Sequence, residues 1–130
     1  MRARFGWAGM LAMLAMAHSA HADGAQNARE RRAVSASGLP AAAVVYAKSD
    51  LVVAIRSRGT PTAGGGVIEG VVLQGEVISD EAERVIGYRS MRSTVNVDCV
   101  RRRDLVVKMT VFSEPQAKGV AINRQVPGGW

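Results

Sequence analysis

Six short runs rich in β-branched and other apolar residues, separated by polar or glycine-rich breaks, limit the folds open to this chain. The runs lie at 42–47, 51–57, 67–78, 85–100, 104–112 and 120–126. Such runs are typical of β-strands, and the breaks are too short for the helical crossovers that parallel strands need. The sequence therefore predicts a mainly β fold, a small antiparallel sheet of five to six strands with few or no helices in the mature domain.

The N-terminus has the pattern of a secretory signal peptide. Arg2 and Arg4 precede an uncharged apolar run at 5–17, and the small residues of AHA at 20–22 suit a signal peptidase. The apolar run is too short to span a bilayer. We therefore expect residues 1–22 to be a signal peptide, and the protein to be exported to the periplasm or cell surface rather than integral to a membrane.

Cleavage after Ala22 would leave 108 of the 130 residues, enough for one small domain with a single core. Residues 23–41 are polar, small and charged, which predicts a flexible leader. A short helix could form there, but nothing in the sequence would hold it in place. The β domain is then expected at 42–130.

Two of the breaks between the apolar runs have a distinctive composition. Residues 58–66 hold one proline and four glycines and are expected to form a loop. Residues 79–84 suit either one helical turn capped by Asp80, with Glu83 reaching back, or a solvated acidic loop. The carboxylates of Asp80, Glu81 and Glu83 do not have the spacing of a calcium-binding loop, so we expect them to be solvated rather than to bind a cation.

The net charge bears on the partners of the protein. The full chain carries +6, and loss of Arg2 and Arg4 with the signal peptide leaves 15 Lys and Arg against 11 acids, or +4. A basic excess favours an acidic protein or an anionic surface, and it also aids solubility. In the expected mature chain, only Tyr46, Tyr88 and Phe112 supply aromatic rings before Trp130, so a base-stacking platform and a nucleic-acid partner are not expected.

The segment VNVDCVRRRDLVV, residues 95–107, holds the only cysteine of the chain. Strand alternation from Val95 places Cys99 on the apolar face, which predicts a buried, inert thiol. The alternation restarts after the arginines, so they are expected at a hairpin connection with their side chains in solvent. The candidate binding surface is therefore Arg101, Arg102 and Arg103.

The few histidines and cysteines of the chain restrict the catalytic and metal-binding chemistry that it can perform. Both histidines, His18 and His21, lie in the expected signal peptide. A mature chain without histidine excludes a Cys–His dyad, histidine acid–base catalysis and metal sites built from Cys and His. A single cysteine cannot form an intrachain disulfide. We therefore expect no enzymatic activity, and we assign no catalytic residue, metal ligand or cofactor.

Residues 87–119 resemble the C-terminal half of the bacterial surface-adhesin protein E-like family. The shared pattern is a Tyr-x-Ser strand, an Asp-Cys dipeptide followed by basic residues, a second strand, and a loop ending in glycine. Besides the three arginines, the matching positions are Tyr88, Ser90, Asp98, Cys99 and Gly119. The resemblance implies a small, exported, non-enzymatic antiparallel sheet in a family of which some members bind host extracellular proteins.

Members of that family can carry a C-terminal helix tied to the sheet through the cysteine. This sequence has no second cysteine and ends at PGGW, so neither the helix nor the tether is expected within these residues. The departure leaves open that the domain is truncated at its C-terminus.

The functional prediction is an exported, non-enzymatic β domain of the bacterial envelope. It would act as a binding or adhesin-like module for an envelope or extracellular protein, or for an anionic surface. Two alternatives stay open: a thiol-based redox or metal-responsive protein that uses Cys99, and a structural subunit of an envelope assembly. A homodimer also stays open, because Cys99 or an edge strand can pair with a second copy.

Overall fold

The computed structural model describes residues 24–126. The expected signal peptide at 1–22 lies outside this range, as do residues 127–130. Among the helices of the described range, none combines the length and the apolar character needed to cross a membrane.

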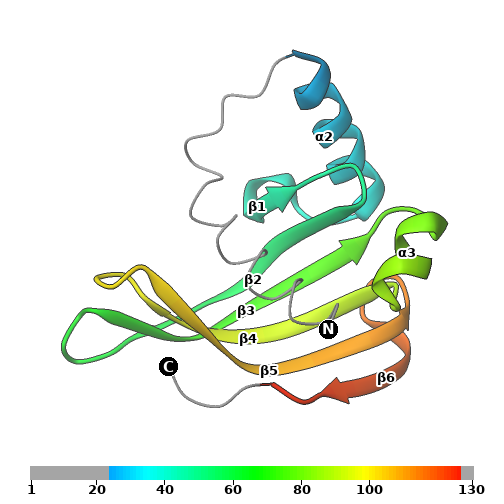
Figure 1. The fold of residues 1–130 in the computed structure, drawn as a ribbon. Helices are drawn as coiled ribbons and strands as arrows, with labels where there is room; N and C mark the ends of the chain where they lie inside the picture. Colours follow the sequence, from blue (N-terminus) through cyan, green and yellow to red (C-terminus); the bar gives the residue numbers. More distant parts are fainter. Residues whose placement is uncertain (1–23, 127–130) are drawn as a thin grey trace.

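Six strands form one antiparallel sheet in which each strand pairs with the next along the chain. Their bounds are β1 Val44–Ala47, β2 Leu51–Pro61, β3 Val67–Val77, β4 Ser90–Asp98, β5 Arg103–Glu114 and β6 Lys118–Arg124. Figure 1 shows β1 and β6 at the two edges of the sheet. The predicted mainly β fold is confirmed, with two α-helices in the described range.

The hairpins β2–β3 and β4–β5 extend together beyond the rest of the sheet (Figure 1). The turn of one contacts the turn of the other, because the Cys99 N–H donates to the Gly66 carbonyl at 2.9 Å. The prediction of a loop at 58–66 is wrong for the first half of that range, because β2 continues to Pro61. Gly59 permits this continuation: it has a φ of 71°, and a Cβ there would collide with the Glu69 carbonyl.

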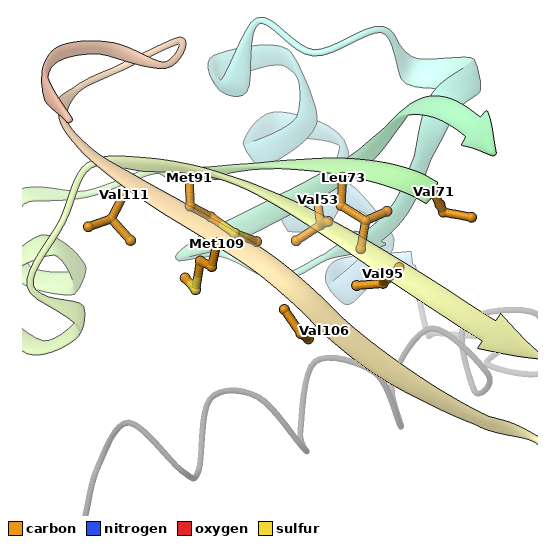
Figure 2. Close-up of a cluster of buried hydrophobic side chains, with 8 residues drawn as sticks. All are labelled: Val53, Val71, Leu73, Met91, Val95, Val106, Met109 and Val111. Carbon is orange, nitrogen blue, oxygen red and sulfur yellow. The ribbon is translucent and has the colours of Figure 1, made fainter. Parts of the chain in front are cut away.

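One face of the sheet carries the main apolar cluster. Its buried members come from β2 to β5 and appear in Figure 2: Val53, Val71, Leu73, Met91, Val95, Val106, Met109 and Val111. Gly75 lies opposite Met91, and a Cβ on Gly75 would be 3.0 Å from Met91 Cε, so the glycine makes room for the fully buried methionine. Burial of each large side chain contributes about 1.5–3 kcal/mol.

The opposite face of β2 is covered by helix α2 (Gly24–Ser37) and the residues after it. Ala33 and Leu39 are buried against Val52 and Ala54, and the 3₁₀ turn η1 (Ala41–Ala43) leads into β1. This differs from the flexible leader expected at 23–41. The helix is held in place because small side chains on both elements allow close packing, although α2 lacks a continuous apolar stripe.

The acidic segment after β3 forms helix α3 (Asp80–Ile86), one of its two expected structures. The cap is Ser79, not Asp80: the Ser79 hydroxyl accepts from the Ala82 N–H at 3.1 Å. The helix ends at Gly87, which has a φ of 94°. The strand expected from residue 85 therefore begins only at Ser90.

The prediction that Cys99 is buried on the apolar face is wrong, because the thiol is exposed. Strand β4 ends at Asp98, and Cys99 is already in the turn. Alternation of side chains holds only while the backbone stays extended, so counting from Val95 fails one residue past the strand end. Arg101 and Arg102 do lie in the β4–β5 connection, as predicted, and Arg103 is the first residue of β5.

Candidate functional site

The end of the β4–β5 hairpin, residues 101–103, forms a basic tip. All three arginine side chains are exposed there. The Arg103 guanidinium lies 3.5 Å from the Asp98 carboxylate, which is itself only 8 % exposed. The tip thus presents three exposed guanidinium groups, with the largely buried carboxylate of Asp98 beside Arg103 and Asp104 next in the chain, so that residues 98–104 carry a net charge of +1.

Asp98 fixes the backbone of this turn. Its Oδ1 accepts from the N–H of Val100 at 3.2 Å and from the N–H of Arg101 at 3.0 Å. The bond from Arg101 is the largest influence on the pKa of Asp98 and lowers it, and the Arg101 and Arg103 side chains add to that effect against desolvation. Arg102 has a φ of 52°, the left-handed conformation that closes the turn.

The basic tip also carries two exposed neighbours. The thiol of Cys99 is accessible, and the side chain of Val100 is 78 % exposed and lies over Gly66. An accessible thiol, an apolar side chain and three guanidinium groups therefore share one turn. Cations, hydrogen-bond donors and a small apolar contact are what this surface offers to a partner.

A polar pocket with a volume of about 230 Å³ lies on the same side of the sheet as α2. It is lined by Ser37, Gly38, Leu39, Arg56, Gln74, Arg92 and Gln116. Gln74 and Arg92 are direct partners on β3 and β4, and Arg56 sits where the register of β2 against β3 shifts. Arg92 and Asp98 are six residues apart on β4, so the pocket lies about 20 Å from the residue at which the tip begins.

Two polar side chains are buried beneath the pocket. Gln74 is 4 % exposed and Glu76 is 2 % exposed. The Gln74 Nε2 donates to Glu76 Oε2 at 2.9 Å, and this contact sets the amide orientation because a carboxylate accepts hydrogen bonds. Gln74 Oε1 is the buried side-chain polar atom that has no partner among the described residues.

The β5–β6 turn closes one side of the pocket. Gln116 and Ala117 have φ values of 62° and 57°, conformations that cost about 1–3 kcal/mol each in residues other than glycine. Two hydrogen bonds offset this cost: Gln116 N–H donates to Glu76 Oε1, and Ala117 N–H donates to Ser90 Oγ, both at 2.9 Å. The side chain of Gln116 thereby reaches the backbone of Gly38.

The motif residues that carry the family resemblance are separated in the fold. Asp98 and Cys99 belong to the basic tip, whereas Ser90 is fully buried and donates to the Glu114 carbonyl at 2.6 Å. Tyr88 packs against the main apolar cluster, where burial raises the pKa of its hydroxyl. Gly119 follows the β5–β6 turn with a φ of 80°.

The acidic segment is engaged in ion pairs. Arg89 Nη1 lies 3.0 Å from Asp80 and 3.3 Å from Glu83. Within residues 24–126, no group of three or more His, Cys, Asp or Glu side chains is arranged to hold a metal ion.

Sequence reasoning identified the basic tip and missed the polar pocket. The usable signal was Gln74 and Glu76, two polar residues at alternate positions in the otherwise apolar second half of β3. Their shared face was predictable, but the neighbours Arg56, Arg92 and Gln116 come from three other segments.

Comparison with known proteins gives no match: neither a family model, nor a curated protein, nor a solved structure is similar to this chain. The resemblance of residues 87–119 to the surface-adhesin protein E-like family therefore stays a prediction from the residues.

Proposed function

We propose that this chain is a non-catalytic binding module of the bacterial envelope, exported through residues 1–22, whose basic tip binds an acidic surface on an envelope or extracellular protein. The observation that carries the proposal is the exposure of Arg101, Arg102 and Arg103 at the end of two joined hairpins. Guanidinium groups bind carboxylates with two parallel hydrogen bonds, so an acidic protein suits the tip.

The tip is organised before a partner arrives. The Asp98 carboxylate holds two backbone N–H groups of the turn, and the Cys99 N–H is bonded to the neighbouring hairpin. A turn that is already ordered loses less conformational entropy on binding. Because the arginines are exposed, each contributes modestly and the association is sensitive to salt.

The sequence resemblance supports the adhesin-like side of this proposal. It covers residues 87–119, which include β4, the basic tip and all of β5. The signal-peptide pattern supports a location where such partners are met, the periplasm or the cell surface.

The experiment is a pull-down of envelope proteins with the purified protein. Wild type is compared with a variant in which Arg101, Arg102 and Arg103 are all Ala. The matched control replaces Arg31, Arg32 and Lys118, three other exposed cations, and so changes the net charge by the same amount. The expected result is a partner retained by wild type and control but lost from the tip variant.

The proposal is contradicted if the tip variant retains the same proteins as wild type. It is also contradicted if the control loses them equally, because binding would then follow net charge rather than the tip. Binding to anionic lipid vesicles is measured separately. If the protein is retained on the vesicles and no protein partner is found, the tip binds an anionic surface and not an acidic protein.

One observation favours a second candidate, a thiol-dependent envelope protein: Cys99 is exposed in the basic tip. Such a protein would form a mixed disulfide or a disulfide-linked homodimer through this thiol. Non-reducing electrophoresis of envelope fractions would show a higher-mass species that disappears with reductant and with Cys99→Ser. A single monomeric band in both variants argues against this candidate.

A further inference from the structure

We propose that the polar pocket is a second binding site, for a small hydroxylated carboxylate. The carboxylate would contact the guanidinium groups of Arg56 and Arg92, and a hydroxyl of the ligand would donate to Gln74 Oε1. This site is distinct from the basic tip and goes beyond the proposed function.

The unpartnered oxygen of Gln74 is the first observation. Gln74 lines the pocket and is 4 % exposed, its Nε2 donates to Glu76, and its buried Oε1 has no partner among the described residues. A buried acceptor without a donor is costly, so a ligand that brings an O–H or N–H group regains that energy.

The two arginines are the second observation. Arg56 on β2 and Arg92 on β4 flank Gln74 on β3, and both line the pocket. Strands one removed from each other lie about 10 Å apart, a separation that two arginine side chains can bridge over the strand between them. Two guanidinium groups beside an acceptor select a ligand that is both anionic and a hydrogen-bond donor.

Specific contacts within the chain hold the walls of the pocket in place. The strained backbone of Gln116 is held by Glu76, the same carboxylate that orients Gln74. Gln116 meets Gly38, where a Cβ would lie 2.9 Å from its Nε2. One buried carboxylate thus positions both the floor and one wall of the site.

The charge and size of the pocket narrow the ligand class. A neutral hydroxyl donor suits the site better than an ammonium group, because Arg56 and Arg92 would repel a second cation. The volume of about 230 Å³ accommodates an acid of a few carbon atoms.

The test is an NMR titration of the ¹⁵N-labelled protein with malate, succinate and inorganic phosphate. Malate differs from succinate by one hydroxyl group. The expected result is a shift of the Gln74 side-chain amide signal with malate, and an affinity about tenfold higher than for succinate, since one buried acceptor becomes paired. Equal affinities for malate and succinate, tighter binding of phosphate, or no shift would overturn the proposal.

Arginine variants locate the site. Arg56→Gln and Arg92→Gln are expected to weaken malate binding about tenfold each. Arg58→Gln, an exposed arginine on β2 outside the pocket, is the matched control and should leave the affinity unchanged. If Arg58→Gln weakens binding as much as Arg92→Gln, malate is attracted by the overall positive charge and not by the pocket, and the proposal is wrong.

Gln74→Leu tests the hydroxyl contact. It should remove the difference between malate and succinate while leaving weak carboxylate binding through the arginines. The surface variants Arg56→Gln and Arg92→Gln keep the proposal testable if this buried substitution prevents folding.

Discussion

Single residues control both hairpin turns that flank β5. Asp98 holds the β4–β5 turn through two backbone N–H groups, and Gly119 follows the β5–β6 turn in a left-handed conformation. The sequence marks both positions, because aspartate and glycine are common turn residues. The exposure of Cys99 was not predictable by alternation, since it depends on β4 ending one residue earlier.

Gly119→Ala is expected to destabilise the protein more than Gly70→Ala. Both glycines have positive φ, 80° and 75°, which costs about 1–2 kcal/mol with a Cβ. A Cβ on Gly119 would also collide with Ser113 Oγ and Glu114, whereas Gly70 has open space. Urea unfolding of the two variants measures the difference, and equal losses would contradict it.

Asp98 is expected to titrate below the value of about 3.9 found in unfolded chains, because the folded turn stabilises its charged form. The carboxylate therefore stabilises the fold above about pH 4, and this contribution is lost as the pH falls through the lowered folded pKa. NMR titration of the Asp98 carboxyl carbon gives the value. Arg101→Ala should keep the pKa low, because the backbone N–H remains; a return to about 3.9 would assign the shift to the side chain instead.

The elements differ in how far the sequence predicts them. The strands were predictable because β-branched runs and polar breaks alternate along the chain. Helix α2 was not predictable as a packed element, because its contact uses Ala33 with Leu39 just beyond its end, and no continuous apolar stripe. Its anchorage comes from Val52 and Ala54 in another part of the chain.

A charge on the buried side of α2 should release the helix. Ala33→Asp places a carboxylate at a position that is 4 % exposed and is expected to cost about 1–3 kcal/mol or more. Ala36→Asp, at an exposed position of the same helix, is the control and should change stability by less than about 0.5 kcal/mol. Urea unfolding and protease cleavage within residues 24–37 report the two effects. Equal behaviour would mean that α2 is not anchored through Ala33.

The whole molecule combines a sheet and a basic tip that local patterns predict with a polar pocket that they do not. The basic tip was predictable because its three arginines are consecutive. The polar pocket required the arrangement of β2, β3, β4 and the β5–β6 turn, so its residues could not be grouped from the sequence. The apolar cluster packs against the opposite face of β2 to β5, the strands from which both sites project.

Met91→Ala should test that support. Met91 is fully buried opposite Gly75, so truncation leaves a cavity and is expected to cost about 2–5 kcal/mol. Val107→Ala, at a side chain 42 % exposed on the neighbouring strand, should cost less than about 1 kcal/mol. Urea unfolding at constant m-value compares the free energies of unfolding of the two variants. A loss of stability for Val107→Ala as large as that for Met91→Ala would contradict a core centred on Met91.

Photo-crosslinking in living cells tests the basic tip as a binding surface most directly. A photoreactive amino acid replaces Val100, which is 78 % exposed in the tip, or Val85, which is 77 % exposed on α3. Neither replacement changes the charge. We predict a crosslinked protein adduct from position 100 that disappears when Arg101, Arg102 and Arg103 are Ala, and none from position 85. An equally strong adduct from position 85, or one from position 100 that survives loss of the arginines, would contradict binding through the tip.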